Sequence, residues 1–188
     1  VDNFSLERIG RTGAIFNRDK LEWMNGVYIR KLTPEEFFEA VQPYLMDDLD
    51  AGKAVIAEEN YVRSVLPLVQ ERAKTLVEVV DLTRFFFVEE LDYDASLIIG
   101  KNMDKAATVK ALKAARDRLE PLKSFNSESL ESVLRPLASE LNLRTGQLFG
   151  VLRVAVTGRT AAPPLFETMA VLGRERCLRR IEAALERL

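Results

Sequence analysis

The sequence predicts an all-α protein made of eight or more short helices. Apolar residues recur at three- and four-residue steps over most of the 188 residues. No segment alternates convincingly between apolar and polar residues as a strand would, and no internal repeat of 20–50 residues stands out. The weakly patterned stretch 92–102 indicates a connection, which divides the chain into two expected helical subdomains, residues 1–92 and residues 103–188.

The N-terminal half carries two well-marked helix starts. Asn17 can cap a helix over about residues 17–31, with apolar side chains on one face at Leu21, Met24, Tyr28 and Leu32. Thr33-Pro34-Glu35-Glu36 has the pattern of a capping box with proline at the first helical position, so a second helix begins there. Pro43 is expected to bend or end this second helix.

The most apolar stretch, about residues 58–80, predicts either two helices or one bent helix with Pro67 inside. The run Phe85–Val88 after it fits a helix or a short extended segment. The C-terminal half predicts five further helices, at Asp104–Leu122, Ser127–Leu141, Thr145–Gly158, Leu165–Leu172 and Arg174–Leu188. The fourth of these follows a proline-containing turn, Ala161–Pro164.

Composition excludes several classes of site. The chain has no histidine and one cysteine, Cys177, which removes histidine-dependent nucleophiles, internal disulfides and structural zinc sites. No glycine-rich phosphate loop is present, and the paired carboxylates are expected to face solvent, so neither a catalytic residue nor a metal site is predicted. The 27 basic and 29 acidic residues give a net charge of −2, which excludes a uniformly basic surface but not a local basic patch.

Three features of the sequence bear on the cellular compartment of the protein and on whether it is part of a longer chain: its apolar runs, its first residues and its single cysteine. The apolar runs are shorter than a membrane span of about 18–20 residues, and the first residues do not resemble a secretory signal. A single cysteine fits a reducing compartment, and we expect a cytoplasmic protein. Because the chain starts at Val1 rather than at methionine, we expect it to be a piece of a longer protein.

Arg72 is the first candidate binding residue. It lies at helical spacing among apolar residues, on a line with Val65, Leu68, Leu76 and Val79. A guanidinium in such surroundings must extend to solvent, pair with a carboxylate, or reach an external ligand, and the pattern leaves these alternatives open. In the third case its planar fork would bind a base edge or a phosphate.

The C-terminal third contains the densest group of arginines and a proline-stiffened loop, 157–166. Its members are Arg153, Arg159, Arg174, Arg176, Arg179 and Arg180. Glu175 can pair with Arg179, which fits a solvated helix face. The loop TGRTAAPPLF beside the group combines rigidity with backbone donors and acceptors, which favours single-stranded RNA as the ligand, although a plain interhelical turn fits the same pattern.

The same regions resemble bacterial class I glutamyl-tRNA synthetases. The segment from Phe4 to Phe16 and the following KLEWMNGVYIR (20–30) are similar to the stem-contact segment after the KMSKS-type loop of that family. QERAKTL (70–76) resembles the family's first anticodon-binding helices, and VTGRTAAPPLFETMAVLGRERCLRRIEAAL (156–185) resembles its C-terminal anticodon-binding subdomain. The ATP-binding motifs of the family are absent, so the resemblance implies a non-catalytic, tRNA-binding region of glutamate–tRNA ligase.

The resemblance also implies roles for individual residues. Arg72 falls where the family's arginine hydrogen-bonds the third anticodon base and favours C over G. The implied anticodon-binding loop residues are Ala162, Pro163, Pro164 and Leu165, with Ala162 replacing a residue that often carries a hydroxyl. The candidates for RNA backbone contacts are Arg159, Arg174, Arg176 and Arg180, and the stem-contact motif contributes Lys20, Trp23 and Asn25.

The implied partner is tRNA(Glu), bound by a monomer without a membrane or a metal. No cofactor is expected in this region, because ATP and Mg²⁺ belong to the family's separate catalytic domain. The alternative from another class is an all-helical protein–protein interaction module, which predicts a large exposed apolar groove and no dependence on RNA. A helical enzyme with its own active site is disfavoured by the missing histidines and phosphate loops.

Overall fold

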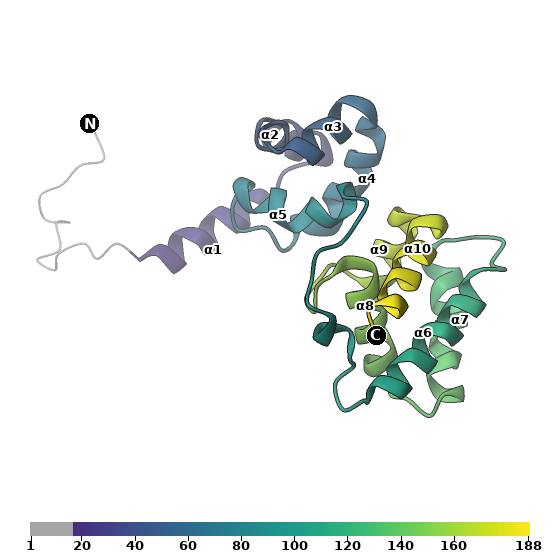
Figure 1. Cartoon of the computed structure of the whole chain (residues 1–188). Coiled ribbons are helices and arrows are strands. Elements are labelled where there is room, and N and C mark those ends of the chain that lie inside the picture. The colour runs from purple at the N-terminus through teal and green to yellow at the C-terminus, as the bar shows by residue number, and fades with distance from the viewer. Residues whose placement is uncertain (1–16) are drawn as a thin grey trace, which may run out of the picture.

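The computed structural model describes residues 17–188, and within this range the chain is all-helical, as predicted. Two groups of helices follow one another, joined by an extended connection that includes a short 3-10 helix, Ala95–Ile98 (Figure 1). The first group comprises α1 (Arg18–Ile29), α2 (Pro34–Asp47), α3 (Leu49–Ala57), α4 (Glu59–Gln70) and α5 (Leu76–Phe87). The second group comprises α6 (Lys105–Leu119), α7 (Ser127–Glu140), α8 (Thr145–Thr157), α9 (Leu165–Leu172) and α10 (Arg174–Glu186). No helix of the described range has the length and apolar character needed to span a bilayer.

Helices α2 to α5 enclose the smaller of two hydrophobic cores. Their inward faces contribute Phe37, Phe38, Val41, Leu45, Val55, Val62, Leu66, Val69 and Val79. The predicted capping box is present: the Thr33 side chain accepts from the Glu36 N–H, and the Glu36 carboxylate accepts from the Thr33 N–H at 2.8 Å. Helix α1 extends away from this group and meets it mainly through its C-terminal end (Figure 1).

Of the two outcomes expected for Pro43, it does not end α2, which continues to Asp47; Val41 and Leu45 on either side are fully buried and hold the helix. One element of the N-terminal half differs from the prediction. Helix α3 was not predicted at all, because its start follows the end of α2 directly. Asp48 caps it by accepting from the N–H groups of Asp50 and Ala51.

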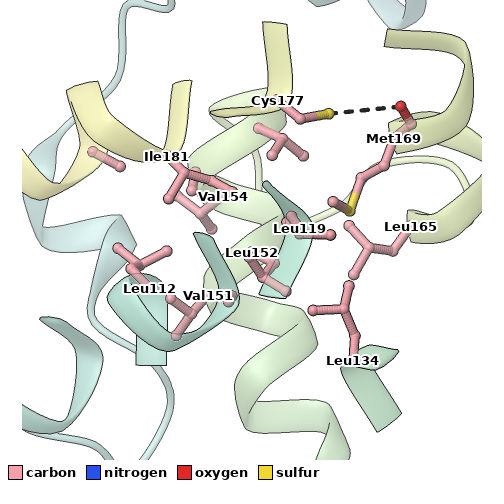
Figure 2. Close-up of a cluster of buried hydrophobic side chains, with 14 of the residues drawn as sticks. Leu112, Leu119, Leu134, Val151, Leu152, Val154, Leu165, Met169, Cys177 and Ile181 are labelled. Atoms are coloured by element: carbon pink, nitrogen blue, oxygen red, sulfur yellow. Dashed lines mark hydrogen bonds between the residues drawn. The ribbon is translucent and has the colours of Figure 1, made fainter. Parts of the chain in front are cut away.

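The larger core lies between α6, α7, α8, α9 and α10. Figure 2 shows Leu112, Leu134, Leu165 and Ile181, from α6, α7, α9 and α10, around Val151 and Leu152 of α8. Cys177 is buried in this core with its Sγ 3.6 Å from the Met169 carbonyl oxygen. Burial raises the pKa of the Cys177 thiol to about 12, so Cys177 is a packing residue. Phe85 and Phe86, at the end of α5, also join this core and so tie the two helix groups together.

Candidate nucleic-acid interface

Arg72 lies in the turn between α4 and α5, where its side chain is exposed. The predicted stretch 58–80 is two helices, and α4 ends at Gln70, so Arg72 is not on the continuous apolar helix face that singled it out. Because the helix ends before Arg72, its charged side chain does not have to lie on the buried apolar face of α4. No ion pair holds its guanidinium among the described residues.

A second arginine from the other helix group lies near Arg72. Arg153 is the only charged residue of α8, and its half-buried side chain leaves Nε without a hydrogen-bond partner. Burial lowers the pKa of the Arg153 guanidinium, and the positive charge of Arg72 lowers it further. The two like charges, one from each helix group, therefore repel one another, and an anion or another acceptor bound near them would relieve this repulsion.

Arg153 belongs to the C-terminal arginine group seen in the sequence, but it was not among the residues predicted to contact RNA. The signal that drew attention to Arg72, a single cation in an apolar helical run, was present in LFGVLRVAVT (148–157) as well. What the sequence could not show is that the chain brings Arg153 close to Arg72, which is 81 positions earlier by the numbering.

The loop after α8 is held in a defined shape. The Thr157 hydroxyl donates to the Arg153 carbonyl oxygen at 2.7 Å and accepts from the Arg159 N–H at 3.2 Å. Gly158 has φ +70°, and a Cβ there would lie 3.0 Å from the Tyr93 ring, so both backbone and space require glycine. This glycine ends α8, as predicted, and directs the loop towards α9.

Within this loop the predicted RNA-contact residues differ in exposure. Ala162 and Pro163 are buried, and Leu165 is only 6% exposed because its side chain packs in the larger core. Pro164 is exposed, as is Ala161. Buried side chains fix the path of the loop, so a ligand would meet mainly its backbone groups and these two exposed residues.

Arg159 bridges the loop to α5. Its guanidinium donates to both carboxylate oxygens of Asp81, at 2.8 and 3.0 Å. This bidentate pair connects the two helix groups at the loop and gives Arg159 a protein partner. Both side chains remain partly exposed, so a phosphate from solvent could compete with the Asp81 carboxylate for Arg159.

We expect Asp81→Asn to lower the free energy of unfolding by about 0.5–1 kcal/mol at pH 7. The hydrogen bond from Arg159 holds the pKa of Asp81 below its ordinary range, against a smaller opposite effect of burial. Because the folded-state pKa is the lower one, the pair stabilises the fold above the unfolded-state pKa of about 3.9 and this stabilisation is lost as the pH falls through the folded-state value. The difference between the thermal melts of the two proteins should therefore shrink as the pH falls from neutral into the acid range. The exposed Asp92→Asn is the control, and a difference that does not change with pH would contradict this role of Asp81.

Arg180 corrects one of the predictions. It was expected to face the RNA backbone, but it is 4% exposed and donates to the carbonyl oxygens of Val156, Phe85 and Val88, each at 2.7 Å. Burial lowers its pKa to about 10, so the guanidinium remains charged at neutral pH. The backbone ends of α5 and α8 left these carbonyls without partners, and Arg180 satisfies them.

Arg176 has a similar structural role one turn earlier. Its Nη1 donates to the Tyr61 hydroxyl at 2.8 Å and to the Phe86 carbonyl oxygen at 2.7 Å, and its side chain is 22% exposed. Tyr61 of α4 in turn donates to the Phe86 carbonyl oxygen of α5, so it connects α4, α5 and α10. Burial raises the pKa of the Tyr61 hydroxyl. Arg174 is half-buried, with its guanidinium 5.9 Å from the Phe125 ring centroid and its Nε without a partner.

The three residues predicted from the stem-contact motif lie on α1 and are exposed. Asn25 donates from Nδ2 to the Lys74 carbonyl oxygen at 2.5 Å, and so fastens α1 to the turn that carries Arg72. Trp23 lines a cleft together with Arg72. Lys20 lies at the first turn of α1, where its N–H is capped by Asn17. The N-terminal part of the family resemblance, Phe4–Phe16, lies outside the described residues.

The described residues contain no group of three side chains suited to hold a metal ion. The candidate interface comprises exposed Arg72 and half-buried Arg153 from different helix groups, the loop that follows α8, and Trp23 on α1. Guanidinium groups supply charge and planar donors, and the loop backbone supplies further donors and acceptors. These are the groups by which proteins bind phosphates and unpaired bases.

Comparison with known proteins also relates this chain to RNA-binding proteins. Residues 36–185 match the family described as "Anticodon binding domain". The chain is 47% identical over 188 residues to a glutamate–tRNA ligase of Dehalococcoides mccartyi (strain CBDB1), covering all of this chain and 39% of that protein. It is also 47% identical over 186 residues to a glutamate–tRNA ligase of Roseiflexus castenholzii (strain DSM 13941 / HLO8), covering 98% of this chain and 37% of that protein. The chain thus spans about two fifths of the length of these curated relatives.

A solved structure shares the fold. The glutamate tRNA ligase from Elizabethkingia meningosepticum CCUG26117 superposes with a TM-score of 0.75 over 97% of this chain and 35% of that one. The sequence identity is 23%, so the likeness concerns the arrangement of helices.

Proposed function

Because this chain belongs to the anticodon binding domain family, we propose that it is the tRNA-binding part of a glutamate–tRNA ligase and that it binds the anticodon arm of tRNA(Glu). The observation that carries the proposal is a pair of arginines from the two helix groups, exposed Arg72 and half-buried Arg153, which are near enough for the charge of Arg72 to lower the pKa of Arg153 and neither of which has an ion pair among the described residues. An RNA strand supplies what the pair lacks, since phosphate oxygens and base carbonyls accept from guanidinium groups.

The mechanism we propose is positional. This region binds the anticodon arm, orders its unpaired bases, and keeps the acceptor end of the tRNA in register with a distant active site. The parent protein would join glutamate to tRNA(Glu) with ATP and Mg²⁺ bound in another domain, and this region would hold no cofactor. We propose that it acts as a monomer in the cytoplasm.

Within the site, the two arginines have different roles. Arg72 is exposed on a turn and can reach a base edge, so we assign it to recognition of the third anticodon base. Arg153 lies on α8, half-buried and near Arg72, so we assign it to the RNA backbone or a base carbonyl. The backbone of the loop around Ala162 and Pro163 would contact the other two anticodon bases, since these side chains are buried. Of the predicted phosphate contacts, Arg159 and Arg174 remain in the proposal, while Arg176 and Arg180 are assigned to the fold.

We expect Arg72→Ala to narrow the preference for an anticodon that ends in C over one that ends in G by about 5–100-fold, because a guanidinium-to-base contact discriminates by about 1–3 kcal/mol. Filter binding with two anticodon stem–loop RNAs that differ only in this base measures the ratio. Arg84→Ala is the control, because Arg84 is also exposed but is paired with Asp48 on the smaller helix group. An unchanged ratio in Arg72→Ala would remove Arg72 from base recognition.

The proposed function itself is tested by gel shift of the 188-residue chain with tRNA at two salt concentrations. We expect a complex whose affinity falls steeply with salt, because the released counterions belong to RNA phosphates. Absence of any complex at low salt would refute the proposal and would favour a protein-interaction module.

A further inference from the structure

A cleft of about 400 Å³ lies between α1 and the turn that joins α4 to α5. Trp23 and Arg30 line it from α1, and Arg72 and Lys74 line it from the turn. Its volume is within the range of about 300–1,000 Å³ that is usual for small-molecule sites. The cleft therefore places an aromatic ring and a guanidinium around one space, although the two residues are 49 positions apart in the numbering.

The walls of the cleft are fastened to one another. Asn25 Nδ2 donates to the Lys74 carbonyl oxygen at 2.5 Å, and Gln70 Nε2 donates to the carbonyl oxygens of Ile29 and Leu32, both at 2.9 Å. Gly26 is buried at the contact, where a Cβ would lie 3.1 Å from Arg30 Nη1 and 3.4 Å from the Ala73 carbonyl oxygen. These contacts bring the α1 backbone against the turn, so the positions of Trp23 and Arg72 relative to one another follow from the fold.

Trp23 is exposed to 65%, which is unusual for the largest apolar side chain in the chain. Its indole is not needed for either hydrophobic core, because neither core includes it. A tryptophan held in place but left uncovered offers a flat apolar face, on which a nucleobase of any sequence can stack.

The charged residues around the cleft indicate whether it suits a neutral base or a phosphate. Three cations and three carboxylates line it: Arg30, Arg72, Lys74, Asp19, Glu22 and Glu71. The sum of these formal charges is zero, which does not favour a phosphate. A neutral base suits it better, with the Trp23 ring against its face and donors and acceptors available at its edge.

We propose that this cleft binds one unpaired nucleotide of the RNA, whose base stacks on the Trp23 indole while Arg72 hydrogen-bonds its edge. The inference rests on the proposed function, since it assigns a nucleotide-binding subsite within that RNA interface. It gives Trp23 a role in base binding in place of the stem contact expected from the sequence, and it makes Asn25 a positioning residue that holds α1 on the turn.

Trp23 is the only tryptophan of the chain, so its fluorescence reports directly on stacking. We expect titration with an anticodon stem–loop RNA to quench this fluorescence with the same midpoint as filter binding. Replacing the unpaired loop nucleotides one at a time by abasic residues should abolish the quenching at one position and retain it at the others. RNA binding without quenching, or quenching that survives every abasic replacement, would overturn the subsite.

The variants complete the test. Trp23→Ala is expected to weaken RNA binding about tenfold, and Trp23→Phe by less, because a phenyl ring still stacks. Tyr28→Ala is the matched control, since Tyr28 is equally exposed (65%) on the same helix but does not line the cleft.

Melting temperatures of the variants, expected to equal that of the unmodified chain, show that the fold is retained. Equal losses in Trp23→Ala and Tyr28→Ala would refute stacking while leaving the proposed function standing, whereas failure of the unmodified chain to bind RNA would refute the proposed function itself.

Discussion

Arg180→Met is expected to lower the free energy of unfolding by about 3–5 kcal/mol, the largest effect on stability that we predict. The guanidinium of Arg180 satisfies the carbonyl oxygens of Val156, Phe85 and Val88, which come from both helix groups. Methionine fills a similar volume but donates nothing, so three carbonyls in a buried region lose their partner. Urea denaturation followed by circular dichroism measures the change.

Two further variants separate this role from a general effect of charge. Arg179→Ala removes the neighbouring arginine, whose side chain is 65% exposed and paired with Glu89, and should change stability by less than about 0.5 kcal/mol. Arg180→Lys keeps the charge but cannot reach three carbonyls with a planar fork, so it should recover only part of the loss. Equal stability of Arg180→Met and the unmodified chain would show that these hydrogen bonds do not hold the two groups together.

Arg153→Met is expected to weaken RNA binding by about 10–100-fold, because a charge-assisted hydrogen bond contributes about 1.5–3 kcal/mol. Its effect on stability should have the opposite sign. The half-buried guanidinium of Arg153 has an unpartnered Nε, and both burial and the nearby charge of Arg72 lower its pKa, so removing it relieves desolvation and repulsion. We expect a gain in unfolding free energy of about 1 kcal/mol, as is found where residues are retained for function at a cost in stability.

The measurements are filter binding at several salt concentrations and urea denaturation of the same samples. Loss of a phosphate contact should reduce the slope of log K against log salt by about one, whereas loss of a base contact should leave that slope unchanged. Arg118→Met is the control, since it makes the same change of charge at an exposed arginine paired with Glu140. If Arg153→Met binds RNA as the control does, Arg153 is not part of the interface.

The two predictions concern arginines that the sequence presents alike. Arg153 and Arg180 both belong to the basic C-terminal third, and each lies within a predicted helix. The Nε atoms of both are buried without a partner, but the Nη atoms of Arg180 donate to three carbonyl oxygens, whereas the Arg153 guanidinium has no hydrogen bond or ion pair among the described residues. An arginine whose guanidinium donates to acceptors within the protein stabilises the fold, as Arg180 does. An arginine near the junction of the two helix groups without such acceptors is available to bind a ligand, which is the role we propose for Arg153.

Local pattern was enough to predict most helices. The capping box at Thr33–Glu36, the start at Thr145 and the end at Gly158 depend on residues close together in the chain, and their hydrogen bonds form within one turn. Helix α3 was missed although Asp48 caps it, because its start follows the end of α2 directly. Whether Pro43 ends α2 was left open by the sequence, and burial of Val41 and Leu45 against other helices decided that the helix continues.

The sequence by itself determined the all-helical class, the main helix limits and the regions that resemble an anticodon-binding protein, because these depend on periodicity, capping and short motifs. Only the tertiary structure decided which arginines are available. It placed Arg72 on a turn, brought Arg153 near it, opened a cleft between Arg72 and Trp23, and buried Arg180 among carbonyl oxygens. The physical reason is that the partners of a charged side chain come from segments far apart in the chain, and residue order alone contains no distances between them.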